Sequence, residues 1–152
     1  MRKVWFRLLC ATWLLAAGTP VRAEVRVVDD SGATISLAQP AKRIISLAPH
    51  LTETLFAAGA GERIVGTVEY SEYPPAASRI ARVGGYSRVD LERVAALRPD
   101  LIIAWQSGNA AAHLDRLRAL RIPIYLSQLN RIEDVASEIE RLGVLAGSPA
   151  VA

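Results

Sequence analysis

Three aromatic residues that end or follow predicted strands are the side chains most suited to recognising a ligand. Tyr70 follows an apolar run at Ile64–Val68, Trp105 ends another at Leu101–Trp105, and Tyr86 lies between the two runs. Flat aromatic side chains bury a large area at little cost in rotamer freedom, so they suit the face of a broad, flat ligand. The alternative is that they belong to the core or to a lid. We assign Tyr73 and Tyr125 to that role, and the residue pattern leaves both roles open for Trp105.

The residues that could catalyse a reaction form no recognisable constellation. His50 and His113 are far apart and belong to no HxxxH or HxxE pattern of the kind that binds metals. His113 is expected to be solvated on a helix, and His50 to be an ordinary loop histidine, with a site role as the alternative. Ser46 and Ser107 lack a GxSxG turn, and the acidic residues are scattered. We therefore expect no enzyme, no resident cofactor and no metal site.

The elements that must position the aromatics alternate between strands and helices. The patterns predict a hairpin over 25–37, strands at 43–47, 64–68, 101–105 and 122–126, and helices at 52–60, 91–97, 109–120 and 130–145. Alternation of this kind predicts an α/β fold, with a mainly parallel sheet flanked by helices. In such a sheet, ligands gather at the carboxyl ends of the strands.

Three local details of these helices are specific enough to check. Asp90 is expected to cap the helix that follows it. Leu114, Leu117 and Leu120 are expected to face inward from the helix at 109–120. Asn130 and Glu133 resemble a capping box.

The first 23 residues have the pattern of a secretory signal peptide. Arg2 and Lys3 precede a short apolar stretch at Leu8–Ala17, and small residues follow before Glu24. The apolar stretch is about half of the ~20 residues that a membrane span needs. We expect cleavage after residue 23, a domain over 24–152 and export to the periplasm, with an uncleaved anchor as the alternative.

Charge and cysteine content agree with an exported protein that does not bind nucleic acid. The 152 residues carry a formal charge of +3, but the leader holds four basic residues and no acid, so residues 24–152 carry 14 basic and 15 acidic side chains. This balance argues against a nucleic-acid partner. The single cysteine, Cys10, lies in the leader, so the mature chain has no thiol to mispair in an oxidising compartment.

Several stretches of the chain are informative together: Arg43–Pro49 with Thr52-Glu53, Tyr70–Pro75, Asp90–Arg93 and Leu97–Trp105. In this order they resemble one family, the periplasmic substrate-binding proteins of ABC importers for cobalamin, ferric siderophores and haem. Tyr70–Pro75, and Ala104-Trp105 followed by Gly108-Asn109, look closest to the cobalamin branch.

The resemblance implies two α/β lobes joined by a long helix, with the ligand held in the cleft between them. This chain would be the amino-terminal lobe, with residues 133–152 entering or approaching the connecting helix and the second lobe missing. Tyr70 and Trp105 match positions that line the cobalamin cleft, and Tyr86 stands where the best-known members have Trp. Glu92 matches the acidic residue that docks on arginines of the membrane permease. Its alternative role is that of a solvated first-turn glutamate.

The expected function is capture of cobalamin or a related corrinoid in the periplasm and its delivery to the ABC transporter permease. Polar groups around a corrin edge could come from Ser71, Ser87, Gln106 or Asn109, none of which is singled out. The alternative ligand is a ferric siderophore or haem, for which Tyr86 or His50 would serve as an iron ligand. A secreted hydrolase and a purely structural exported module are the remaining alternatives.

Overall fold

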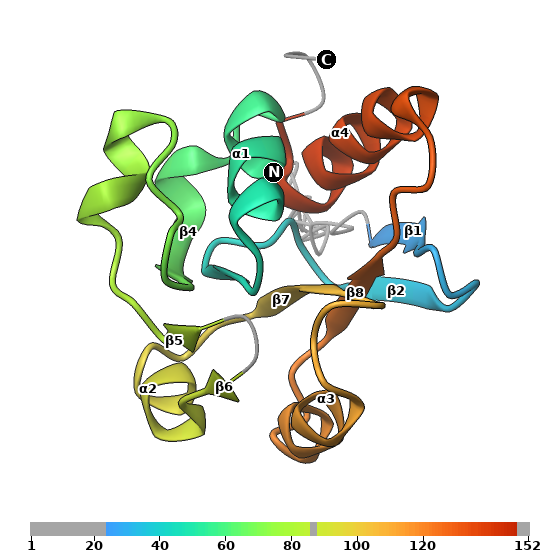
Figure 1. Cartoon of the computed structure of the whole chain (residues 1–152). Helices are drawn as coiled ribbons and strands as arrows, with labels where there is room; N and C mark the ends of the chain where they lie inside the picture. Colours follow the sequence, from blue (N-terminus) through green and yellow to red (C-terminus); the bar gives the residue numbers. More distant parts are fainter. Residues whose placement is uncertain (1–23, 86–87, 149–152) are drawn as a thin grey trace, which may run out of the picture.

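Four parallel strands form the central sheet of the protein (Figure 1). The computed structural model describes residues 24–85 and 88–148. Across the sheet, the strands lie in the order β4 (Ile64–Thr67), β3 (Ile44–Ser46), β7 (Leu101–Trp105) and β8 (Ile124–Ser127). All neighbouring strands pair in parallel, which confirms the predicted α/β class.

Helices cover both faces of this sheet (Figure 1). On one face, α1 (Pro49–Ala57) and α4 (Ile132–Ala146) pack over a cluster that includes Ile44 and Ile103. On the other face, α2 (Leu91–Ala96) and α3 (Ala111–Ala119) pack over a cluster that includes Ile45 and Ile102. Successive strand residues therefore enter opposite clusters, which explains the continuous apolar run of β7. No helix among the described residues is long and apolar enough to span a bilayer.

Short elements complete the described chain. The predicted hairpin is present as β1 (Val25–Val28) antiparallel to β2 (Thr34–Leu37). The segment after β4 contains the 3₁₀ turn η2 (Pro75–Arg79) and the two short antiparallel strands β5 (Gly84–Gly85) and β6 (Arg88–Val89). A further 3₁₀ turn, η1 (Gly61–Arg63), leads into β4.

The β1–β2 hairpin is attached to the outer edge of β8 by two aspartates in its turn. The Asp29 carboxylate accepts a hydrogen bond from the Leu126 amide at 3.1 Å, and the Asp30 carboxylate accepts one from the Gln128 amide at 2.7 Å. Asp30 also forms an ion pair with Arg141 of α4 at 2.7 Å. The first described strands are thereby joined to the last strand and the last helix.

The predicted helices are present, but some details differ. The first begins at Pro49 rather than Thr52, because proline fits the first turn, where its missing N–H has no intrahelical partner. Leu114 and Leu117 face inward as predicted, but the inward assignment of Leu120 is wrong, because α3 ends before it and leaves it 37% exposed.

The two predicted helix caps have different outcomes. Asp90 caps α2 as predicted and accepts hydrogen bonds from the amides of Glu92 and Arg93, both at 3.1 Å. The predicted capping box of α4 is wrong by one residue. Asp134 accepts from the amides of Asn130 and Arg131 at 3.2 and 3.0 Å, because the helix begins after Arg131 and its third residue is the one that reaches back.

Candidate functional site

The carboxyl ends of the parallel strands meet at one edge of the sheet, where α/β proteins bind their ligands. Trp105 is the last residue of β7, and Tyr70 follows β4 at the edge of the sheet. Strand β3 lies between them and leads into the start of α1 at His50. The topology therefore brings these three aromatic rings to the same edge.

Trp105 is partly buried, and the turn that follows it holds its backbone in place. Its amide donates a hydrogen bond to the Asn109 side-chain oxygen at 2.7 Å, and the Asn109 amide group donates to the carbonyl of Leu47 at 3.0 Å. A Cβ on Gly108 would overlap the indole ring, so this turn needs glycine for the close approach. Asn109 is 4% exposed, so its suggested place among ligand-facing polar groups is wrong: it joins the ends of two strands.

His50 lies against Trp105 from the neighbouring helix. The two ring centroids are 5.2 Å apart, with their planes at 87°, an edge-to-face contact. Burial lowers the pKa of His50, and the nearby Glu53 carboxylate opposes this in part, so the neutral ring is favoured. His50 is therefore not a loop histidine: it lies in the first turn of α1 and packs against Trp105 at this edge.

Tyr70 is the most exposed of the candidate aromatic side chains that the structure describes. Its side chain is 76% exposed, and its backbone has a φ of 65°, a conformation that non-glycine residues adopt only when their surroundings hold them there. The next residue, Ser71, fixes this backbone conformation, because its side chain is 1% exposed and turns into the protein. The proposed ligand-facing role of Ser71 is therefore wrong as well.

A cluster of buried hydroxyl groups lies beneath Tyr70. Thr52 lies 2.9 Å from Ser46 and 2.7 Å from Thr67, and Thr67 lies 2.8 Å from Ser71, measured between side-chain oxygens. These residues come from β3, α1, β4 and the Tyr70 loop. Because each hydroxyl can donate and accept, the cluster ties all four segments together without water.

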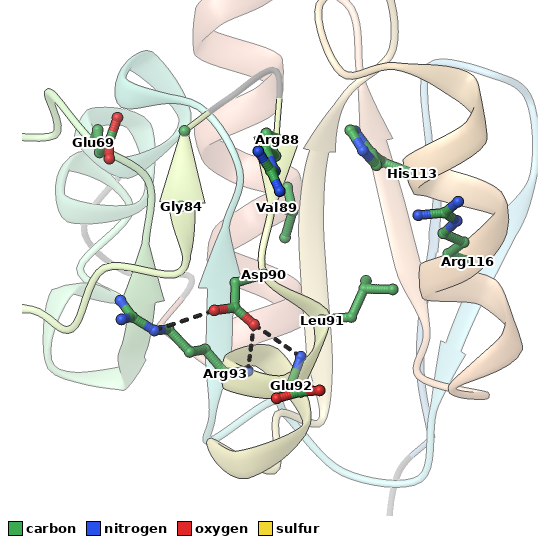
Figure 2. Close-up of a pocket in the computed structure, with 11 residues that line it drawn as sticks. Glu69, Gly84, Arg88, Val89, Asp90, Leu91, Glu92, Arg93, His113 and Arg116 are labelled. Carbon is green, nitrogen blue, oxygen red and sulfur yellow. Dashed lines mark hydrogen bonds and ion pairs between the residues drawn. The ribbon is translucent and has the colours of Figure 1, made fainter.

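Two of the remaining candidates, Tyr86 and Ser87, lie outside the described residues. The third, Glu92, lies away from the aromatic edge. Glu92 is exposed on the first turn of α2, at a cavity of about 720 Å³ that Figure 2 shows. Neither Tyr70 nor Trp105 lines this cavity, so the structure separates Glu92 from those two aromatics.

The other aromatic and histidine expectations have mixed outcomes. Tyr125 is fully buried, as predicted for a core residue, but Tyr73 is 67% exposed and does not belong to the core. His113 is half-buried rather than solvated, and no described group hydrogen-bonds to its buried Nδ1 atom. Among the described residues, no group of three or more His, Cys, Asp or Glu side chains is arranged to hold a metal ion.

The sequence analysis missed a buried acidic side chain on α4. Glu138 is 0% exposed, and neither carboxylate oxygen has a hydrogen-bond partner among the described atoms. Burial is the main cause that raises its pKa, and the nearby Asp30 raises it further. The Ser127 hydroxyl and Arg141 act in the opposite direction. Only the helical spacing of α4 could have indicated that this glutamate faces inward.

Comparison with known proteins gives consistent matches. The sequence profile described as periplasmic binding protein matches residues 44–152. A vitamin B12-binding protein of Vibrio parahaemolyticus is 43% identical over 111 residues, which cover 73% of this chain and 40% of that protein. The vitamin B12-binding protein of Vibrio cholerae is 46% identical over 112 residues, 74% of this chain and 41% of its own length. This chain therefore spans about two fifths of the length of these relatives.

Solved structures show the same likeness in three dimensions. The crystal structure of the periplasmic vitamin B12-binding protein of Vibrio cholerae superimposes with a TM-score of 0.71 at 46% identity, covering 74% of this chain and 44% of that one. A periplasmic haem-binding protein from Pseudomonas aeruginosa superimposes with a TM-score of 0.67 at 27% identity, covering 73% and 40%. With an α/β lobe of matching topology and a profile match over most of its length, this chain belongs to the periplasmic binding protein family.

Proposed function

We propose that this chain is the amino-terminal lobe of a periplasmic protein that captures cobalamin or a related corrinoid for an ABC importer. The observation that carries the proposal is the pair of aromatics at the carboxyl edge of the sheet, an exposed Tyr70 and a Trp105 fixed by Asn109. A corrin ring has broad apolar faces and an amide-fringed edge, so aromatic walls suit it. The relatives named for vitamin B12 binding support this choice of ligand.

The chain's own residues would act by binding alone, with no reaction. Tyr70 and Trp105 would cover one face of the ligand, with Tyr86 as a third contact, while a second lobe would cover the other face. Glu92, exposed on the first turn of α2, would dock on basic residues of the permease after ligand capture. Residues 1–23 would direct export to the periplasm as a cleaved signal peptide.

Haem is the second candidate, and one observation favours it. His50 lies beside Trp105 with its pKa lowered, so a neutral imidazole is available at the same edge to ligate iron. Hemin spectra separate the two ligands, because axial ligation by His50 shifts the Soret band and is lost in His50→Ala. A haem-binding relative at 27% identity supports this candidate less strongly than the relatives at 43–46% support cobalamin.

The test is a calorimetric titration of cyanocobalamin into the full-length gene product. We expect saturable binding that Trp105→Ala weakens by about 1 kcal/mol or more, the amount typical of a stacked aromatic anchor. Ile132→Ala is the matched control, because Ile132 is 88% exposed on α4 and has no part in the site. No binding of cyanocobalamin, or equal affinity in the Trp105 and Ile132 variants, would overturn the proposal.

The proposed docking role of Glu92 is tested separately, by the binding of the protein to membranes. Glu92→Gln removes the charge but keeps the shape, so the affinity for cyanocobalamin should not change. Binding to membranes that contain the permease should weaken, and more so at low salt than at high salt, because screening already reduces an exposed charge contact. Unchanged membrane binding would assign Glu92 to the solvated role.

A further inference from the structure

The cavity beside the first turn of α2 has a charged lining, unlike the aromatic edge. It has a volume of about 720 Å³, within the roughly 300–1,000 Å³ common for small-ligand pockets. Its walls come from the β5–β6 pair, the first turn of α2 and one face of α3 (Figure 2). A wall of this composition does not suit a corrin face, so the cavity requires a different ligand chemistry.

Two charged side chains of this cavity already have partners within the protein. The Asp90 carboxylate caps α2 and also forms an ion pair with Arg93 at 3.2 Å. Arg93 donates a further hydrogen bond to the Arg82 carbonyl at 3.2 Å. Asp90 and Arg93 therefore neutralise each other, and the other ionic side chains of the cavity are Arg88 and Arg116 with the acidic Glu69 and Glu92.

Arg88, His113 and Arg116 also line the cavity. His113 and Arg116 are one turn apart on α3, and Arg88 lies on β6, as Figure 2 shows. Among the described residues, neither the Arg88 nor the Arg116 guanidinium forms an ion pair with a carboxylate or a hydrogen bond. Glu69 lies on the opposite side of the cavity in Figure 2.

We propose that Arg88, His113 and Arg116 form a binding site for a phosphate-type oxyanion. Guanidinium groups match phosphate oxygens with paired N–H donors, and an imidazole N–H supplies one more. Two arginines without internal partners, held on the wall of a concave surface, leave these donors available to a ligand. The acidic Glu69 and Glu92, which also line the cavity, favour a ligand whose body away from the oxyanion carries no further negative charge.

Two sources of this chemistry are possible: free phosphate, or the phosphodiester in the nucleotide arm of a corrinoid. The corrinoid source rests on the proposed function. The first experiment is independent of that function, because it titrates inorganic phosphate into the chain. It follows the heat of binding and the NMR signals of the arginine side chains. We expect saturable binding at millimolar phosphate or below, competition by sulfate, and weakening as sodium chloride is added.

Charge-removing variants locate the site. Arg88→Gln and Arg116→Gln should each weaken phosphate binding by about tenfold, as expected for loss of a charge-assisted contact. Arg79→Gln is the matched control, because Arg79 is an exposed arginine on η2 outside the cavity and loses the same charge. Both cavity arginines are exposed, so the variants should fold normally, as circular dichroism will verify. Absence of saturable phosphate binding, or equal loss in the Arg79 control, would overturn the proposal.

A second comparison identifies the source of the oxyanion. Cyanocobalamin carries the phosphodiester and dicyanocobinamide lacks it, so both are titrated into the full-length gene product and its Arg88→Gln, Arg116→Gln double variant. Weaker binding of cyanocobalamin alone assigns the site to the corrinoid phosphodiester. Equal binding of both corrinoids, together with lost phosphate binding, assigns it to free phosphate. If no corrinoid binds at all, the proposed function fails, while the phosphate titration still decides the site.

Discussion

The imidazole of His50 meets the indole of Trp105 edge to face, with ring centroids 5.2 Å apart. The two residues come from α1 and β7, and the end of β3 leads directly into α1. Trp105 is the only tryptophan after residue 23, so its fluorescence reports on this contact without interference from another indole.

This contact predicts how the emission of Trp105 depends on pH. A protonated imidazole quenches a neighbouring indole, so emission should fall with acid at a midpoint below the usual histidine value of about 6.5. Because burial lowers the pKa of His50 in the folded state, the unfolded state binds the proton more readily. Stability from this group is therefore full at neutral pH and is lost as the pH falls. His50→Gln should abolish the step, and a midpoint at or above 6.5 would contradict the burial argument.

Gly108→Ala should disturb the turn that holds Trp105. The new Cβ would overlap the indole ring, so the ring or the turn must move, at a cost of about 1–3 kcal/mol in the free energy of unfolding. Chemical denaturation measures the loss, and the tryptophan emission maximum should shift as the ring becomes more exposed. Ser107→Ala, at the exposed neighbouring position, is the control and should change neither quantity.

Thr67→Val tests the hydroxyl cluster beneath Tyr70. The substitution keeps the shape of the side chain but removes the hydroxyl that contacts both Thr52 and Ser71, leaving buried polar groups with fewer partners. We expect a loss of about 1–3 kcal/mol in unfolding free energy and faster amide exchange in the Tyr70 loop. The control is Thr34→Val on the exposed face of β2. A loss of unfolding free energy no larger than in that control would show that the hydroxyl cluster does not anchor the Tyr70 loop.

Glu138→Gln tests the buried carboxyl on α4. Because burial raises the pKa of Glu138 in the folded state, folding favours its protonated form, and this contribution to stability is lost as the pH rises through the raised pKa. Glutamine cannot ionise, so the variant should be more stable than the wild type by about 1 kcal/mol or more at pH 8, with a much smaller difference at pH 4.5.

Urea denaturation at the two pH values measures this effect. The groups that face Glu138 are Asp30 from the hairpin, Arg141 from α4, and Ser127 and Tyr125 from β8. The control is Glu140→Gln, an exposed change on the same helix. Equal pH dependence in the wild type and Glu138→Gln would show that folding does not raise the pKa of Glu138.

Hydrophobic periodicity was enough to predict the hairpin, the four strands of the parallel sheet and the four α-helices, but not the short pair β5 and β6. The run at 101–105 has no polar alternation, and it became the buried strand β7, while Asp90 proved to be a helix cap because its short carboxylate reaches two free amides. The errors occur at helix ends, where a shift of one residue changes which side chain is buried or caps the helix. Leu120 lies just beyond the end of its helix, and the α4 cap uses Asp134 instead of Glu133.

The candidate site was predictable only in part. The positions of Tyr70 and Trp105 follow from their place at strand ends, because all parallel strands end at one edge. The inward turn of Ser71 and Asn109 depends on partners more than ten residues away, such as Thr52 and Leu47, which no local pattern encodes. The contact between His50 and Trp105 likewise joins residues from separate elements.

The two aspartates of the β1–β2 turn also affect how the lobe behaves toward other copies of itself. Strand β8 is the last strand of the sheet, and such an edge offers unpaired amides on which another chain can add a strand. Here the outward amides of Leu126 and Gln128 are occupied by the carboxylates of Asp29 and Asp30. The hairpin turn thus disfavours edge-to-edge aggregation, because it places the Asp29 and Asp30 carboxylates where an incoming strand would have to lie.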